Sequence, residues 1–174
     1  MVIDEEILKD GINEKLIAEL INRHGTECGR IKRLIDYYLG KHEILNRERI
    51  GDKTANNRIL CNHAKYIVDM IKSYLVGNPV SYVCSEDYDI EAVKNCYIEQ
   101  DMASIDTELE KEMSICGRTY EMVYVNENAL PRSIRLSPLN TFVVYACRVG
   151  EKPLFGVHYY KKYDIMGNVT GVCC

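Results

Sequence analysis

Residues 64–82 have the sequence "AKYIVDMIKSYLVGNPVSY", which predicts a helix followed at once by a strand. Apolar side chains recur at helical spacing on one face, and we expect this face to pack against the core. They are Ala64, Ile67, Val68, Ile71, Tyr74 and Leu75. Asn62 is a suitable N-cap, Gly77 can supply the positive φ of a C-cap, and Pro79 holds the residue before it extended. The stretch therefore predicts a rigid corner between a helix and a strand at 80–84, with no group that could attack a bond or hold a metal ion.

The chain before this corner predicts two helices and a polar arm. Apolar residues keep helical spacing over 4–24 and again over 26–39, and we expect an αα-hairpin with its bend near Gly25. Asn13 is the expected N-cap of the secure part of the first helix. Residues 41–57 are polar and lack a sustained period, which predicts an extended arm. Acidic residues are mixed with the basic ones in this arm, which favours a solvated loop over a nucleic-acid patch.

The chain after the corner predicts helices first and strands second. Helices are expected within 87–116, where Asp89 and Ser104 can cap them and Gly117 can end the last one. The hydrophobic period then changes to two, which predicts an antiparallel meander. Its strands are expected at 120–124, 133–137, 141–148 and 154–161. This order predicts an α+β fold, with N-terminal helices followed by a mainly antiparallel β-sheet that packs with helices.

Two parts of the chain are expected to form separate domains. Residues 1–57 would comprise the N-terminal helical hairpin and the extended arm, and residues 58–174 an α+β core. A length of 174 residues suits one domain, or one and a half. The last expected strand has barely begun at Cys174, which predicts a chain truncated at its C-terminus.

Bulk composition is that of a soluble globular protein, with 47% hydrophobic and 28% charged residues. The acidic N-terminus is unlike a signal peptide and no apolar run is long enough to span a bilayer, so we expect a cytoplasmic protein with no membrane partner. The net charge of −4 contrasts with the basic face of a sequence-specific DNA-binding protein. The eight cysteines include no Cys-x-x-Cys pair, so we expect buried free thiols in place of disulfides or a zinc site. A role for Cys173 and Cys174 stays open.

No constellation of residues predicts an enzyme, and we assign no catalytic, cofactor-binding or metal residue. The four histidines lie in four different expected elements, and His63 is interpreted as a first-turn residue and not as a base. Two alternatives stay open. Glu86, Asp87 and Asp89 form an acidic cluster that a metal-dependent nuclease or hydrolase could use, although acidic residues before a helix are also explained by its dipole. The 41–57 arm could instead bind a partner, which would make the chain a small adaptor domain.

Tyrosine dominates the aromatic residues, with thirteen Tyr against two Phe and no Trp. Such tyrosines are typical of half-buried positions that use their hydroxyl groups, and also of contact surfaces in an oligomer. The sequence does not separate these two interpretations.

Three segments with specific motifs follow one another in the chain. They are "LIDYYLGKHEI" (34–44), "NNRILCNHAKYIVDMIKSYLVGNPVSY" (56–82) and "CGRTYEMVYVNE…IRLSPLNTFVVY" (116–145). In this order they resemble the N-terminal region of portal proteins from long-tailed bacteriophages, the head-to-tail connector family. The resemblance covers about residues 30–160. Cysteines at 61, 84, 96, 116 and 147 depart from the family pattern without disturbing the fold, because a free Cys behaves as a small hydrophobe.

The resemblance implies a structural, non-enzymatic subunit of a cyclic ring, usually twelve-fold, at one vertex of the capsid. Double-stranded DNA would pass through the ring during packaging and ejection without sequence-specific binding. The implied partners are further copies of the chain, the terminase large subunit, capsid or scaffold proteins and head-completion proteins, and no cofactor is implied. The implied location is the virion, after assembly in the host cytoplasm.

The N-terminal part of such proteins forms much of the outer wing, which is α+β in character. The stem, the clip and the tunnel loops come later in the family's sequences, so no DNA-contacting residue is assigned here. Since the stem contacts are missing, we expect this chain by itself to be monomeric or weakly associated.

Overall fold

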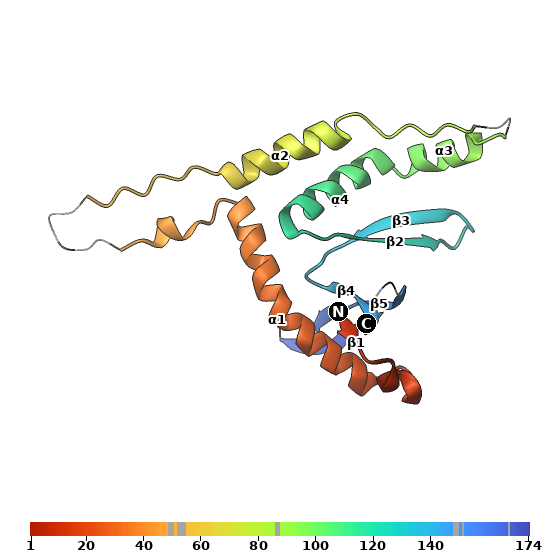
Figure 1. Cartoon of the computed structure of the whole chain (residues 1–174), viewed down its shortest axis with the longest axis horizontal. Helices are drawn as coiled ribbons and strands as arrows, with labels where there is room; N and C mark the ends of the chain where they lie inside the picture. The colour runs from red at the N-terminus through yellow and green to blue at the C-terminus, as the bar shows by residue number, and fades with distance from the viewer. Residues whose placement is uncertain (49–50, 52–54, 86–87, 148–149, 151, 167) are drawn as a thin grey trace. The chain divides into compact units, whose positions relative to one another are not determined.

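The computed structural model describes residues 1–48, 51, 55–85, 88–147, 150, 152–166 and 168–174, and it confirms the predicted α+β class (Figure 1). The chain forms two compact units. The first unit combines Met1–Ile31 with Leu136–Cys174, and the second is Lys32–Arg135. The expected division after residue 57 coincides with neither unit, and as a statement about domains it stays a prediction. None of the described helices combines the length and the apolar character that a membrane span requires.

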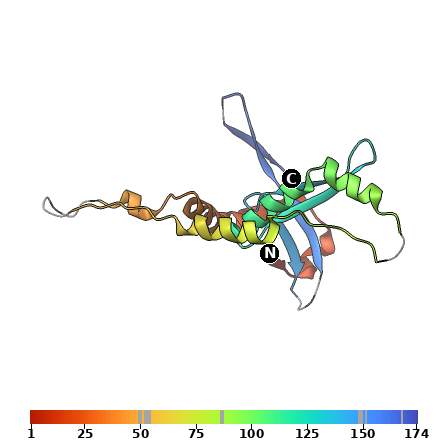
Figure 2. The ribbon, with the colours of Figure 1, turned by 90° about the horizontal axis from the view of Figure 1, so that it is seen from above.

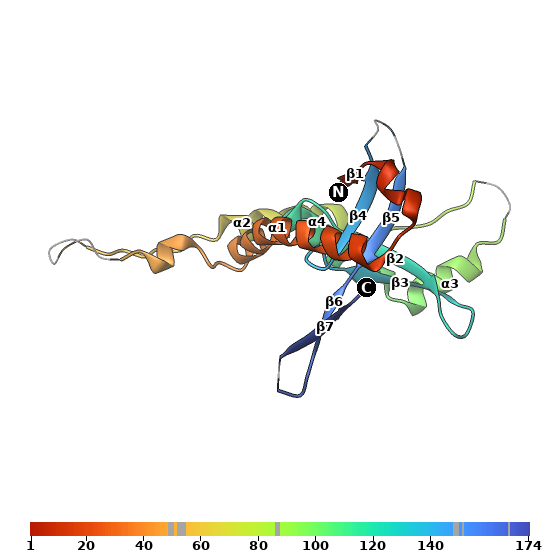
Figure 3. The ribbon, with the colours of Figure 1, turned by 90° about the horizontal axis from the view of Figure 1, so that it is seen from below.

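The first unit is a small sheet covered by a helix. Its elements are β1 (Val2–Ile3), a 3₁₀ helix (Glu5–Asp10), the first part of α1 (Glu14–Tyr38), β4 (Thr141–Ala146), β5 (Pro153–His158), β6 (Tyr160–Tyr163) and β7 (Val169–Cys173). The sheet has the order β1-β4-β5, with β1 parallel and β5 antiparallel to β4, whereas β6 and β7 form a separate hairpin (Figure 3). The buried core joins α1 to this sheet. It consists of Ile3, Leu16, Leu20, Phe142, Val144, Val157 and Tyr159.

The expected αα-hairpin is wrong, because one helix occupies its place. Helix α1 passes through Gly25 and Gly29 without a break. A glycine in a helix interior costs about 1 kcal/mol relative to Ala, but it keeps the backbone hydrogen bonds and so does not end a helix by itself. The expected cap is confirmed, since Asn13 Oδ1 accepts a hydrogen bond from the Leu16 amide at 2.9 Å.

The second unit places helices on a β-hairpin. Its elements are the last turns of α1, a 3₁₀ helix (Glu43–Asn46), α2 (His63–Val76), α3 (Glu91–Glu99), α4 (Met102–Cys116), β2 (Tyr120–Val125) and β3 (Pro131–Leu136). Helix α2 packs along α4, and the β2–β3 hairpin lies on the other side of α4 (Figure 1). Extended chain leaves both ends of α2, which is yellow in Figure 2. The predicted N-cap is confirmed, because Asn62 Oδ1 accepts a hydrogen bond from the Lys65 amide at 3.1 Å.

The corner after α2 differs from the prediction in two details. Gly77 stays helical, with φ −65° and ψ −26°, and a Cβ at this position would lie 2.2 Å from the Ser73 carbonyl oxygen. The glycine is therefore required by a close backbone approach and not by a positive φ. Residues 79–84 are extended but lie in no strand, so the predicted strand at 80–84 is wrong. Alternating side chains indicate an extended backbone, but a strand also needs a hydrogen-bonded neighbour, and no described strand pairs with this segment.

The remaining differences concern element boundaries and strand pairing. Helix α4 begins at Met102 and not at the expected cap Ser104, because Asp101 has a left-handed backbone (φ 51°) that separates α4 from α3. The expected end of α4 is confirmed, since Gly117 has φ 73° and donates its amide to the Met113 carbonyl at 2.8 Å. The single meander is wrong, because the strands form three small sheets. A period of two shows which side chains share a face, but it does not show which strands pair.

Candidate assembly surface

Helix α2 is apolar on two sides, and described residues cover only one of them. Val68 is 7% exposed, and Ala64 and Ile71 on the same side are partly buried. The other side carries exposed apolar side chains, which we call the outer stripe. They are Tyr66 (68% exposed), Ile67 (50%), Met70 (55%) and Tyr74 (89%). The predicted core positions Ile67, Tyr74 and Leu75 are therefore wrong, since Leu75 is also exposed.

The outer stripe is continuous and uncharged. At about 100° of rotation per residue, its four side chains span an arc of about 100° on α2. The charged residues of the helix, Lys65, Asp69 and Lys72, project outside this arc. His63 is exposed at the first position of α2 and lies at the end of the stripe, where it contacts no cluster that could make it a base. A surface of this kind is typical of a contact face.

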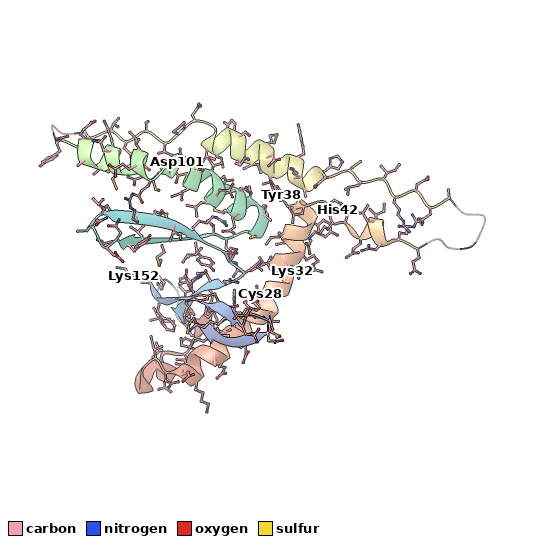
Figure 4. The ribbon with its side chains drawn as sticks, turned by 180° about the vertical axis from the view of Figure 1, so that it is seen from behind. Cys28, Lys32, Tyr38, His42, Asp101 and Lys152 are labelled. Carbon is pink, nitrogen blue, oxygen red and sulfur yellow. The ribbon has the colours of Figure 1, made fainter. Side chains whose placement is uncertain are left out.

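Hydrogen bonds within the second unit hold α2 in a fixed position. The Tyr38 hydroxyl donates to Asp69 Oδ1 at 3.1 Å, and Asn62 Nδ2 donates to the Tyr38 carbonyl at 2.9 Å (Tyr38 is labelled in Figure 4). Burial and the neighbouring Asp69 carboxylate raise the pKa of Tyr38. Gly40 has φ +79°, and a Cβ there would lie 3.2 Å from Asn62 Nδ2. The N-terminal half of α2 is thus tied to the end of α1.

An apolar groove of about 630 Å³ lies beside the corner that follows α2. One wall is the extended segment Pro79–Val83, and the other is formed by α3 and the start of α4. Its lining includes Val80, Ile98 and Met102, and we call it the α3 groove. Tyr82 and Tyr97 meet across it with their ring centroids 4.5 Å apart. Asp101 (Figure 4), at which the chain turns from α3 into α4, also lines the groove.

The α3 groove contains a carboxyl group that the fold does not fully compensate. Burial raises the pKa of Asp106, and the negative charge of Glu121 raises it further. Asp106 lines the groove together with Asp101 and Lys94. The groove is therefore apolar along its walls, with hydrogen-bond acceptors that a hydroxyl group could reach.

Polar contacts join α4 to the β2–β3 hairpin. Arg135 Nη1 donates to Glu112 Oε1 at 2.6 Å, and the Thr119 hydroxyl donates to Glu112 Oε2 at 3.1 Å. Burial nevertheless raises the pKa of Glu112, and Arg135 and Thr119 only partly oppose that effect. On the α3 side, the Ser133 amide donates to Gln100 Oε1 at 2.7 Å. These hydrogen bonds connect α3, α4 and the β2–β3 hairpin within the second unit.

A buried polar cluster in the first unit was not anticipated from the sequence. His24 is 1% exposed, its Nδ1 lies 3.0 Å from the Tyr159 hydroxyl, and its ring lies 4.8 Å from that of Phe142. Cys28 donates to the Leu139 carbonyl at 3.3 Å and lies 3.5 Å from His24 Nδ1 (Cys28 is labelled in Figure 4). The only sequence signal is the spacing of four between His24 and Cys28, which places both on one face of a helix. The groups satisfy one another's hydrogen bonds inside the core, so we interpret them as structural.

The residues that sequence reasoning considered for chemistry lie apart. Among the described residues no three His, Cys, Asp or Glu side chains gather where they could hold a metal ion. The expected cap at Asp89 is one residue away from the N-cap of α3, which is Ile90 and makes no side-chain cap hydrogen bond. Asp89 Oδ1 accepts a hydrogen bond from the Glu91 amide at 2.9 Å, and Glu86 and Asp87 lie outside the described residues. The 41–57 arm contains one 3₁₀ turn (Glu43–Asn46), and its residues 49–50 and 52–54 are likewise outside the described part.

All eight cysteines are free thiols, as expected, but most of them are not buried. Only Cys116 is buried, and four are exposed. The exposed ones are Cys61, Cys84, Cys147 and Cys174. Their exposure corrects the expectation of buried thiols. Cysteines that form no disulfide are buried in most proteins. This preference is an average over many proteins, and the position of a residue in the fold decides the individual case.

The chain is similar to portal proteins of bacteriophages. It is 28% identical over 165 residues to the portal protein of Bacillus phage SPP1, in a match that covers 89% of this chain and 32% of that protein. The chain thus spans about a third of the length of this curated relative. The family model described as phage portal protein, SPP1 Gp6-like, matches residues 17–171. The chain therefore belongs to the SPP1 Gp6-like family of phage portal proteins, as the sequence motifs indicated.

Proposed function

We propose that this protein is a structural subunit of a portal ring at one vertex of a phage capsid, where the ring forms the conduit for DNA packaging and ejection. The observation that carries the proposal is the family match over residues 17–171, which covers the whole second unit and most of the first. The family is structural and non-enzymatic. In this proposal the chain has a structural function, and the hydrogen bonds within its second unit would keep the contact surfaces of that unit in place.

Electrostatics support a conduit more than a gripping surface. The 26 acidic residues outnumber the 22 basic ones, and the net charge of −4 repels phosphates, so DNA can slide past the subunit without strong binding. Double-stranded DNA is accordingly a passing cargo in this proposal, with no sequence-specific contacts. A ring of identical subunits also needs two different complementary faces on each copy, and the second unit offers both an apolar stripe and an apolar groove.

The proposed partners follow from this position in the virion. They are further copies of the chain, in a cyclic ring that is twelve-fold in the proposal, the terminase large subunit, capsid or scaffold proteins, and head-completion proteins. Assembly takes place in the host cytoplasm. The alternative of a metal-dependent nuclease has no described feature in its favour, since among the described residues no three His, Cys, Asp or Glu side chains could hold a metal ion. An adaptor domain stays an alternative, because an exposed apolar stripe also suits the binding of a different protein.

Negative-stain electron microscopy of the intact gene product tests the proposal. We expect closed rings with a central hole, in low and in moderate salt. The 174-residue chain measured beside it by mass photometry is expected to be monomeric or weakly associated. An intact gene product that stays monomeric at high concentration across several salt conditions would refute the proposal.

A further inference from the structure

The outer stripe needs a cover that the described chain does not provide. A helix that is apolar on two sides is typical of a position between two partners, and α4 is one partner of α2. At roughly 150–250 Å² for a fully buried aromatic side chain, Tyr66 and Tyr74 alone expose a few hundred Å². Monomeric soluble proteins rarely leave a larger continuous apolar patch uncovered, and such patches mark protein contacts.

The composition of the two sides of α2 distinguishes an interior from an interface. The side against α4 is aliphatic, with Ala64, Val68 and Ile71. The outer stripe instead combines two tyrosines with a methionine and an isoleucine. Tyr and Met are enriched at protein–protein interfaces, and Tyr is among the residues that contribute most to binding there. The stripe therefore has the chemistry of a contact between separate chains.

The α3 groove has complementary chemistry. Its two walls carry apolar side chains that are also exposed, with Val83 at 88% and Ile98 at 77%. A hollow of about 630 Å³ accepts several side chains from one helix face. The carboxyl groups of Asp101 and Asp106 can accept hydrogen bonds from tyrosine hydroxyls, which lie at the tips of the side chains that would enter deepest.

We propose that the outer stripe of α2 docks into the α3 groove of a second copy of this chain. The contact is heterologous, because the stripe and the groove are different surfaces, and repeated heterologous contacts close into a ring when the rotation between copies permits it. This inference rests on the proposed function and adds the pair of surfaces that would join neighbouring subunits.

Site-specific photocrosslinking in the intact gene product tests the pairing. A benzophenone amino acid replaces Tyr74 in one variant and Lys65 in a control, since Lys65 is exposed on α2 but lies outside the stripe. We expect irradiation of the position-74 variant to give a covalent dimer on a denaturing gel, with crosslinked peptides from 79–83 or from α3. We expect the position-65 control to give no dimer through those peptides. Crosslinks from position 74 only within one chain, or to another surface of the second copy, would overturn the inference.

A substitution pair separates this inference from the proposed function. Tyr74→Glu places a charge in the stripe, and Lys65→Glu places the same side chain on the same helix outside it. Because Tyr74 is 89% exposed, Tyr74→Glu is expected to leave the circular dichroism spectrum unchanged. We expect at least tenfold weaker ring assembly for Tyr74→Glu and wild-type assembly for Lys65→Glu, seen by microscopy and by sedimentation. Rings from wild type and Tyr74→Glu alike would refute the docking pair while the portal function stands; no rings from the wild type would refute both.

Discussion

Removal of one hydroxyl group, Tyr159→Phe, tests whether the buried polar cluster stabilises the first unit. Tyr159 is 8% exposed, and its hydroxyl lies 3.0 Å from His24 Nδ1 and 3.3 Å from the Leu139 carbonyl oxygen. Phenylalanine keeps the ring, which meets His24 and Phe142 edge-on, so only the hydrogen bonds are lost. Removing one partner from buried polar groups costs about 1–3 kcal/mol. We expect the free energy of unfolding to fall by about 2 kcal/mol at neutral pH.

Alkaline pH provides a second measurement of the same hydroxyl group. Burial raises the pKa of Tyr159 to about 12, and the neighbouring Cys28 thiol adds to the effect. In the unfolded chain the pKa is about 10. The stabilising contribution is therefore complete below pH 10 and is lost as the pH rises towards 12, because the unfolded chain then releases the proton more readily. Two pKa units correspond to about 3 kcal/mol, so the stability advantage of wild type over Tyr159→Phe should be largely lost over this range.

Urea unfolding of the 174-residue chain, followed by circular dichroism, measures both effects. Tyr163→Phe is the matched control, because Tyr163 is 61% exposed on β6, and its change should stay within about 0.5 kcal/mol. The reasoning is refuted if Tyr159→Phe costs no more than Tyr163→Phe. It is also refuted if the difference between wild type and Tyr159→Phe is constant from pH 9 to pH 12.

Three further substitutions test the second unit by the same urea assay, and Gly25→Ala in the first unit is the control for one of them. Gly77→Ala should lower the free energy of unfolding by about 1–3 kcal/mol, because the new Cβ would lie 2.2 Å from a backbone oxygen. Gly25→Ala should raise it by about 0.5–1 kcal/mol, because Gly25 lies inside α1 with open space around its Cα. Val68→Ala should cost about 2–3 kcal/mol through the lost contact with α4, since two buried methyl groups are removed and a cavity remains. Arg135→Ala should lower the free energy of unfolding by about 1–3 kcal/mol at pH 7, because it leaves the Glu112 carboxylate without its cation. The loss should be smaller near pH 4, because burial raises the pKa of Glu112 and a protonated carboxyl group carries no charge.

Each of these three stability predictions would be contradicted by a specific result. Equal effects of Gly77→Ala and Gly25→Ala would mean that the close approach at Gly77 relaxes without cost. A loss below about 0.5 kcal/mol for Val68→Ala would place its side chain outside the packed interior. A loss for Arg135→Ala that is the same at pH 4 and pH 7 would show that the arginine acts by packing and not by its charge.

Local signals in the sequence determined local features well. Asn13 and Asn62 are polar side chains directly before apolar periodic segments, and each accepts the expected amide hydrogen bond. Gly117 ends α4 in the left-handed conformation that glycine favours. The α+β class followed from the change of period between the helical and the strand-forming parts of the chain. These features depend on interactions within a few residues, so one sequence is enough to predict them.

Features that depend on distant contacts could not be predicted in this way. The strand β1 has only two residues, and its partner β4 lies more than a hundred residues further along the chain, so no periodicity could reveal it. The apolar positions of α2 illustrate the same limit. Ile67 and Val68 are both apolar and adjacent, yet one is half exposed and the other is buried. Periodicity averages over both sides of a helix, and it reports one stripe even where two faces need separate partners.

The proposed docking pair gives the quoted segment 64–82 a physical reason for its tight joint. The outer stripe lies on α2, and one wall of the α3 groove begins at Pro79, only a few residues beyond the end of the helix. The close approach of Gly77 to the Ser73 carbonyl fixes the direction in which the chain leaves the helix. In a ring of heterologous contacts, the angle between the two docking surfaces of one subunit determines how many subunits close the circle. A flexible joint would spread that angle and permit open chains or rings of several sizes. A helix end at which a Cβ would clash with the backbone therefore suits the proposed ring, whose closure depends on one rotation between neighbours.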